Sequence, residues 1–300
     1  MTNIYALNVF VRYVPTGSNL VNFYRDVVGL PLLRTYGAAP ADLYWGGEAS
    51  IFETVEIAGK GLAPEPDADA ASLVPIFRTP DLAAALAELN GKGLSAARLQ
   101  EGARGLEAYF LDPVGRLFAL REAPLDSLRP EDVEARRRLR RGEAFNPGCG
   151  PMPPSIQELG WIVRRCADLD RQTLFYEQAL KLPRLSDLDD RRRFDLGDNV
   201  VLELAPGGRA LADAAERYDN TDAVILRASD TPALRRSAVQ HHGRVVTEKL
   251  NIYWADLAFI ADPEGGVFGL EQAFHPGEYA PGRLALSENL EALRRWRERR

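Results

Sequence analysis

The feature that most constrains this chain is an internal repeat with a period of about 150 residues. Four landmarks keep their order and spacing in both copies: Phe23-Tyr24 and Phe175-Tyr176, Gly47 and Gly197, Asp81 and Asp230, and Asp112-Pro113-Val114-Gly115 and Asp262-Pro263-Glu264-Gly265. Chance does not easily produce four landmarks in register. The chain is therefore two copies of one unit.

Each copy divides again into two strand–helix–strand cycles. In the first copy, an alternating strand over 5–14 leads into an amphipathic helix at about 19–28, and three short strands follow. A polar joint, GKGLAPEPDADAA, separates this cycle from a second one that runs from Ser72 to Arg121. The pattern predicts an α+β fold of four βαβββ modules in two tandem halves. We expect domains at 1–123 and 155–274, a linker with one helix at 124–154, and a tail helix in 275–300.

A single βαβββ module cannot cover its own sheet, because four strands leave an apolar face and open edges. Two modules side by side form a curved, half-closed sheet with a bowl, and helices cover the outside. We expect each pair of modules to form such a mixed sheet. The pairing also explains why the modules occur in twos.

Composition and charge exclude several classes of partner. The chain is 46% hydrophobic and 27% charged with a formal net charge of -6, which fits a globular protein and gives no general attraction to nucleic acid or membrane surfaces. Two cysteines give no disulfide framework, and the N-terminus is typical of a strand. We expect a cytoplasmic protein, a monomer or homodimer, with a small-molecule ligand.

The quoted residues resemble the vicinal oxygen chelate superfamily, which includes glyoxalase I, bleomycin- and fosfomycin-resistance proteins and extradiol dioxygenases. The matching features are Phe23-Tyr24 before Gly29-Leu30-Pro31, its echo before Leu182-Pro183, and the two Asp-Pro-x-Gly turns. The resemblance implies paired modules around a bowl. Four modules in one chain is the layout of extradiol dioxygenases and of doubled glyoxalases, so the layout does not choose a reaction.

The resemblance also implies ligand positions for a divalent metal on the first and last strands of paired modules. Counting from the landmarks places the first-strand positions at about Asn8 and at Val74, Trp161 and Ala223, and the last-strand positions at Glu53, Ala119, Glu203 and Gly269. Most of these side chains cannot coordinate a metal. We therefore expect a metal-free bowl with no cofactor. His241-His242 is a rival metal pair, but a surface turn is the preferred interpretation.

An arginine stands four residues beyond the first-strand position in every module: Arg12, Arg78, Arg165 and Arg227. Residues four apart on a strand share a face, so these arginines are expected to point into the bowl. In glyoxalase-like proteins an arginine here can hold a substrate carboxylate. Internal pairing with Glu53 and Glu203 is an equal alternative. Trp161, Tyr253 and Trp254 are candidates for stacking on a flat ligand, and core packing is the competing interpretation.

The candidate proton-transfer groups are Glu53, Glu203 and Tyr109. A carboxylate in an apolar bowl has a raised pKa, which suits a general base. Tyr109 lies three residues before the Asp-Pro turn, where the resemblance implies an acid–base tyrosine, and its counterpart is Phe259. This difference favours the first half as the active one.

Three functions remain open. The first is a metal-independent enzyme, a lyase, isomerase or hydrolase acting on a small anionic, aromatic compound. The second is a binding or resistance protein that sequesters an aromatic or drug-like molecule without turnover. The third is an extradiol-type dioxygenase with displaced metal ligands. Asn8, the four arginines and the aromatic residues are the expected substrate contacts in the first two.

Overall fold

The structure is a computed structural model that describes residues 4–18, 20–36, 41–46, 50–57, 73–102, 105–123, 156, 158–188, 190–197, 200–210, 222–247, 250–252 and 255–273. The predicted linker helix and tail helix lie outside these residues, as do Tyr253 and Trp254. Gly47 is also outside them.

The first half contains modules one and two. Module one consists of β1 (Ile4–Pro15), the helix α1 (Leu20–Asn22) with its π-helical continuation η1 (Phe23–Val28), β2 (Leu32–Tyr36), β3 (Ala41–Trp45) and β4 (Ile51–Ile57). Module two consists of β5 (Leu73–Thr79), α3 (Leu82–Gly91), β6 (Arg98–Gly102), β7 (Gly105–Leu111) and β8 (Leu117–Glu122).

The second half follows the same plan, but in its described residues two strands follow the helix in module three and four follow it in module four. Module three consists of β9 (Leu159–Cys166), α5 (Leu169–Leu174) with η3 (Phe175–Ala179), β10 (Arg192–Asp195) and β11 (Val201–Pro206). Module four consists of β12 (Ala223–Ala228), α6 (Thr231–Gln240), β13 (Arg244–Val245), β14 (Leu250–Ile252), β15 (Ala255–Ala261) and β16 (Val267–Ala273).

The repeated landmarks have local physical roles. Asp81 and Asp230 are helix N-caps, whose carboxylates accept from the backbone N–H groups of Ala84 and Ala233. In the two Asp-Pro-x-Gly turns, the leading aspartate accepts backbone N–H groups, and the glycine adopts a positive φ of 80° at Gly115 and 89° at Gly265. These two landmarks of the repeat therefore mark the starts of helices and tight turns.

Two mixed sheets form the body of the molecule. Sheet A has the strand order β13-β15-β16-β12-β1-β4-β3-β2, with β14 paired to β15, and sheet B has the order β10-β11-β9-β5-β8-β7-β6. The α+β fold of paired modules is confirmed. However, module one shares its sheet with module four through the antiparallel pair β1–β12, and module two with module three through β5–β9. Each sheet is thus built across the two halves of the sequence and not within either half.

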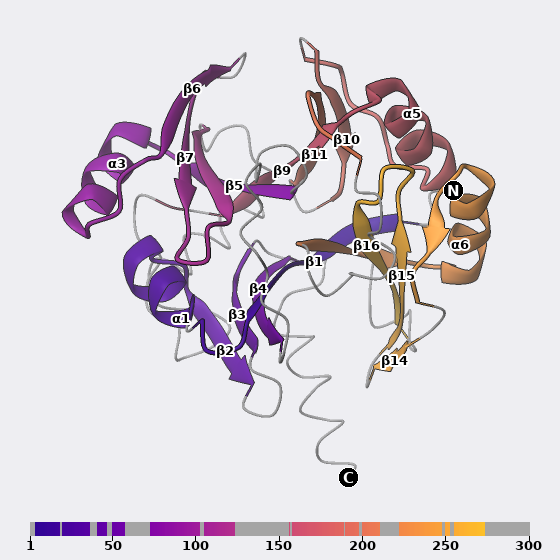
Figure 1. Ribbon diagram of the computed structural model, residues 1–300, viewed down its shortest axis with the longest axis horizontal. Helices are drawn as coiled ribbons and strands as arrows, with labels where there is room; N and C mark the ends of the chain where they lie inside the picture. Colours follow the sequence, from indigo (N-terminus) through magenta and orange to yellow (C-terminus); the bar gives the residue numbers. More distant parts are fainter. Residues whose placement is uncertain are drawn as a thin grey trace.

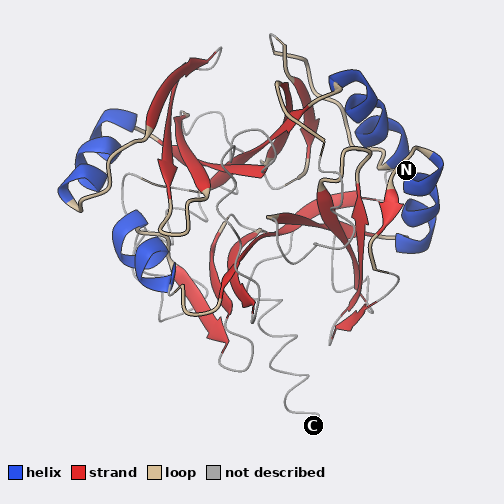
Figure 2. Ribbon diagram, in the orientation of Figure 1, coloured by secondary structure: helices blue, strands red, loops and turns tan. Residues whose placement is uncertain are grey.

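The two sheets lie back to back at the centre of the molecule and curve away from each other, with α1 and α3 on one side and α5 and α6 on the other (Figures 1 and 2). The main core lies between the sheets and under these helices. In the first half it is a cluster of aromatic rings, in which Phe52 of sheet A and Phe77 of sheet B meet edge to face at 5.5 Å. The core therefore joins modules one and two although they share no sheet.

Candidate functional site

Each sheet has a second face, turned away from the shared core, which corresponds to the predicted bowl. Along β4, β12 and β16 the side chains of Phe52, Leu226 and Leu270 enter the core. Because side chains alternate along a strand, their neighbours Glu53, Arg227 and Glu271 lie on the opposite face. We call this face of sheet A the A face. The corresponding face of sheet B, which carries Glu203, is the B face.

Asn8 connects the charged groups of the A face. The β1–β12 ladder shifts register between Leu7 and Val9, so Asn8 lies at a β-bulge that redirects its side chain. Its Nδ2 donates to Glu271 Oε2 at 2.8 Å, and its Oδ1 accepts from Arg227 Nη2 at 2.6 Å. Asn8, Arg227 and Glu271 are all buried. This chain of hydrogen bonds fixes one carboxylate and one guanidinium on the face.

Glu53 has a different environment. Its side chain is only partly buried, and within the described part of the chain no hydrogen bond or ion pair reaches its carboxylate. Burial, and secondly the like charge of Glu271, raises the pKa of Glu53 to about 7. The two acids come from β4 and β16, which flank the central pair β1 and β12. Glu53 is therefore the accessible acid of the A face.

Counting along the sequence placed the last-strand metal-ligand position of module four at Gly269, but Gly269 packs against apolar side chains of the A face. A Cβ there would lie 3.1 Å from side-chain atoms of both Ile225 and Leu257. The charged residue on this strand is Glu271, beside Arg227 on the neighbouring strand. Sequence reasoning missed Glu271. Its signal was present, since Glu271 follows Arg121 of the first copy by the 150-residue repeat.

The B face is closed by a network of ion pairs. Arg121 Nη1 and Nη2 donate to the two oxygens of Glu203 at 3.1 and 2.9 Å, and Arg191 Nη1 donates to Glu203 Oε2 at 2.7 Å. Burial alone raises the pKa of Glu203, but Arg121 and Arg191 more than offset it, so the pKa lies below its usual value. Glu203 is therefore a fixed anion.

Trp161 lies beneath this network. The guanidinium carbons of Arg78 and Arg121 lie 4.2 and 4.3 Å from its ring centroid, and Arg78 Nε is 3.1 Å from Glu158 Oε1. Trp161 is buried among the apolar side chains of the B face. Both the tryptophan and the arginine are thus engaged in internal packing.

Tyr109 also belongs to the B face. Its hydroxyl donates to Glu107 Oε2 at 2.5 Å, and Glu107 accepts from Arg121 Nε at 2.8 Å. Burial, and secondly the charge of Glu107, raises the pKa of Tyr109 to about 12. The three candidate proton-transfer groups are therefore divided: Glu53 is on one sheet, and Glu203 and Tyr109 are on the other.

The prediction that Arg12 points into a bowl is wrong. Arg12 is fully buried on the core side, where its guanidinium donates to Asp222, Tyr24, Asp112 and the Leu117 carbonyl. Its counterpart in the second copy is Arg164, which pairs with Asp262. The prediction counted four residues from Asn8, whereas the equivalent of Trp161 is Val9. Because neighbouring residues on a strand face opposite sides, this difference of one residue assigned Arg12 to the wrong face.

The same bulge occurs in sheet B, where Gly160 takes the place of Asn8. The β5–β9 ladder shifts register there, so Trp161 corresponds to Val9. Gly160 also allows a close approach, because a Cβ would lie 2.7 Å from Arg78 Cγ. Arg165 is half-buried, and in the described part of the chain it has no hydrogen bond or ion pair. The four arginines thus have four different environments.

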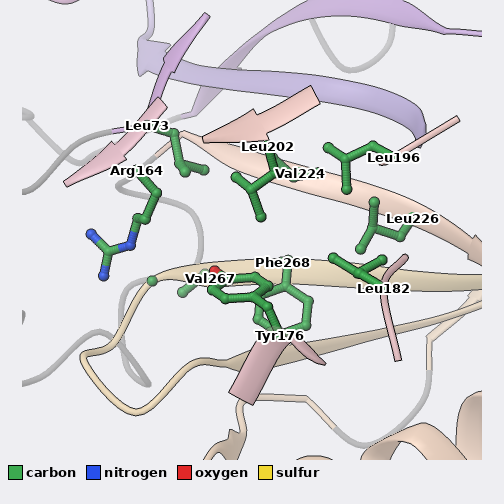
Figure 3. Close-up of a pocket in the computed structure, with 11 residues that line it drawn as sticks. Leu73, Arg164, Tyr176, Leu182, Leu196, Leu202, Val224, Leu226, Val267 and Phe268 are labelled. Atoms are coloured by element: carbon green, nitrogen blue, oxygen red, sulfur yellow. The ribbon is translucent and has the colours of Figure 1, made fainter. Parts of the chain in front are cut away.

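A small cavity lies on the core side of the second half (Figure 3). Its walls are Leu73, Arg164, Tyr176, Leu182, Leu196, Leu202, Val224, Leu226, Gly266, Val267 and Phe268. The volume of this cavity is about 20 Å³. This room suits one or two water-sized molecules and not an aromatic ligand.

The residues of the two faces do not fit the divalent metal that the superfamily implies. On the A face the amide oxygen of Asn8 accepts from the Arg227 guanidinium at 2.6 Å, and that positive charge opposes a metal cation. On the B face Glu203 is covered by arginines. Among the described residues, no three His, Cys, Asp or Glu side chains converge as a metal site. His241 Nδ1 instead donates to the Ser237 carbonyl oxygen at 2.8 Å in a helix-end turn.

Comparison with solved structures decides the fold. Glyoxalase I from Zea mays matches with a TM-score of 0.62 and 17% identity, over 89% of this chain and 92% of that one. A single-substitution variant of the same enzyme gives 0.63 and 18% over 89% and 93%. A Bacillus subtilis protein named as a candidate dioxygenase gives 0.63 and 17% over 91% and 87%. The chain has the vicinal oxygen chelate fold.

Within this fold, the likeness covers all four modules and leaves the chemistry open. No family model matches the sequence, and neither does any curated protein. No helix in the described ranges is long and apolar enough to cross a membrane.

Proposed function

We propose that this vicinal oxygen chelate protein is a metal-independent proton-transfer enzyme of the lyase or isomerase class, with its site on the A face. The observation that supports the proposal is Glu53, an accessible carboxyl group without a described partner, whose pKa is raised to about 7. A general base is most effective when its pKa lies near the working pH. Glu203, at the equivalent place on the B face, is neutralised by arginines.

In the proposed reaction, Glu53 removes a proton from a carbon next to a carbonyl group. The C–H bond breaks, the proton moves to a Glu53 oxygen, and the electron pair moves to the carbonyl oxygen. Arg227, held by Asn8, supplies positive charge for the enolate. Returning the proton to a neighbouring carbon gives an isomerase, and loss of a leaving group from that carbon gives a lyase.

The apolar wall of the A face supports a substrate with an apolar or aromatic body. Ile225, Leu257 and Phe259 surround Gly269 on this face. The anionic substrate predicted from four inward arginines has lost most of its basis. Arg12 lies in the core, Arg78 is engaged with Glu158 and Trp161, and Arg227 donates to Asn8.

Proton exchange with solvent tests this function without knowledge of the final product. The full chain is incubated in D2O with a panel of small carbonyl compounds, and loss of the α-proton signal is followed by NMR. We expect exchange with at least one compound, and a loss of at least about 100-fold in Glu53→Gln, since general-base groups contribute about that much. Tyr109→Phe, on the other face, keeps the ring and should exchange at the wild-type rate.

The other outcomes separate the competing functions. Tight binding of a compound without exchange in any member of the panel supports a sequestering protein and overturns the enzyme. Exchange that survives Glu53→Gln but fails in Tyr109→Phe moves the site to the B face. Stoichiometric iron or manganese in purified protein, with oxygen uptake on catechols, supports the dioxygenase.

A further inference from the structure

The two faces are built on one plan, and the B face shows what a glutamate at this position binds. Glu203 pairs with Val163 on β9 and with Arg193 on β10, as Glu53 pairs with Val11 on β1 and with Leu43 on β3. Its carboxylate holds the guanidinium groups of Arg121 and Arg191, and Arg193 Nε lies 4.0 Å away. On the B face, arginines of the protein itself therefore occupy the space around the Glu203 carboxylate.

On the A face two of these cations are missing from the equivalent positions. Arg193 corresponds to Leu43. Arg121, next to Arg78, corresponds to Glu271, next to Arg227. Glu53 therefore faces an apolar side chain and a second carboxylate where Glu203 faces two of its arginines.

An aromatic ring repeats the same contrast. Tyr109 pairs with Ala119 on the B face, and the guanidinium carbon of Arg98 lies 4.3 Å from the centroid of its ring. Phe259 pairs with Gly269 and so occupies the equivalent position on the A face. The A face therefore has an aromatic ring, Phe259, at the position where the ring of Tyr109 on the B face packs against the Arg98 guanidinium.

We propose that the A face binds a small organic cation, an ammonium or guanidinium group on an apolar body, between Glu53 and Glu271. The proposal rests on the proposed function for the choice of face, and it names the substrate class. In the described part of the A face, two carboxylates, Glu53 and Glu271, accompany the one guanidinium of Arg227 and leave an excess of negative charge, which a cation offsets and a carboxylate increases. Glu271, held by Asn8, binds the cation, and Glu53 remains the proton acceptor beside it.

The test is a calorimetric titration of the full chain with four probes of similar size: benzylamine, benzylguanidine, benzyl alcohol and benzoate. We expect the two cations to bind at least about tenfold more tightly than the alcohol, and benzoate most weakly. Glu271→Gln should weaken the cations about tenfold and leave the alcohol unchanged. Glu56→Gln is the control, because Glu56 on the same strand accepts from Gly17 N on the other face.

Leu43→Arg is a second variant that copies Arg193 into the A face. We expect it to abolish cation binding, since the new guanidinium reaches Glu53 first. Leu43 is buried, so this variant is interpreted only if it melts as a folded protein, and Glu271→Gln decides otherwise. Benzoate or benzyl alcohol binding as tightly as the cations overturns the proposal.

The two proposals fail separately. Cation binding without proton exchange in any compound sinks the proposed function and leaves the cation site standing. Proton exchange confined to uncharged or anionic compounds supports the function and rejects the cation as substrate.

Discussion

Glu53 and Glu203 occupy equivalent positions on β4 and β11, and their pKa values are displaced in opposite directions. Burial raises the pKa of both carboxyl groups; at Glu203 the charges of Arg121 and Arg191 more than offset burial, whereas at Glu53 the like charge of Glu271 adds to it. Opposite Glu203 stands Arg121, which binds it through two hydrogen bonds, whereas opposite Glu53 stands Glu271. The replacement of arginines by Glu271 and an apolar side chain thus separates a structural carboxylate from a reactive one.

Glu53→Gln should make stability less sensitive to pH. The folded pKa of Glu53 is above its ordinary value of 4.5, so the folded state binds the proton more tightly. Unfolding free energy therefore falls as pH rises from 4.5 to 7, by at most about 3 kcal/mol for this partly exposed group. We expect the variant to melt several degrees higher than wild type at pH 8 and equally at pH 4.5, by thermal unfolding. A lower melting temperature at pH 8 would contradict the environment described for Glu53.

Glu203→Gln should have the opposite effect. It removes the carboxylate that binds Arg121 and Arg191 and leaves Glu107 as an anion beside the buried Arg121, so we expect a cost of about 3 kcal/mol, at the low end for a broken buried ion pair. Because the folded pKa of Glu203 is lowered, its contribution is present above pH 4.5 and is lost as the pH falls below that value. The loss should therefore be large at pH 7 and shrink in acid, as measured by urea unfolding. An effect that does not depend on pH would remove the ion pair as its cause.

Glu271→Gln should lower the pKa of Glu53 without returning it to 4.5. The substitution removes the like charge, which is the second cause of the shift, and keeps burial, which is the first. NMR titration of carboxyl-labelled protein should give a pKa between 4.5 and 7. An unchanged value would show that the two acids do not interact.

Arg12→Met should unfold much of the protein at moderate temperature. Arg12 connects three modules through Tyr24, Asp112 and Asp222, so its loss leaves two buried carboxylates without a cation and costs about 3–5 kcal/mol. Arg165→Ala, which removes a half-buried arginine without a described partner, should change stability by less than about 0.5 kcal/mol. Denaturant unfolding of the two variants distinguishes a structural from a peripheral arginine.

Leu202→Phe should stabilise the protein. Leu202 lines the cavity, and its counterpart in the first copy is Phe52, which packs in the aromatic core. The phenylalanine ring is larger than the leucine side chain and fills the cavity, and filling a cavity commonly raises the free energy of unfolding by about 0.5–2 kcal/mol. Phe52→Leu in the other half should lose about 1 kcal/mol or more. If the first variant is less stable than wild type, the cavity is too small to accept a ring.

The repeat spacing predicted the modules, the N-caps and the turns because these are local features, which a fixed residue count transfers from one copy to the next. The faces were harder. A bulge at Asn8 and another at Gly160 insert one residue into the first strands, and a shift of one residue reverses the side of a sheet. This is why Arg12 was assigned to the wrong face and why Trp161 was aligned with Asn8 instead of Val9.

Other features had no local signal. The pairing of module one with module four joins residues more than 200 positions apart, such as Leu7 and Leu226. The residues of neither strand indicate which strand it pairs with. Glu271 could have been found from the repeat, since it follows Arg121 at the common spacing. The counting from metal positions directed attention to Gly269 instead. The sequence therefore predicted the larger cause of the raised pKa of Glu53, which is burial, and missed the second, which is the charge of Glu271.

The crossing of the two sheets between the halves also sets a condition on folding during synthesis. When the first half has left the ribosome, β1 and β5 still lack the partners β12 and β9, which belong to the second half. At typical elongation rates of about 5–20 residues per second, β5 waits a few seconds for β9, and β1 waits on the order of 10 s for β12. Unpaired strand edges invite association between chains. Newly made copies must therefore be protected from one another until the last module arrives.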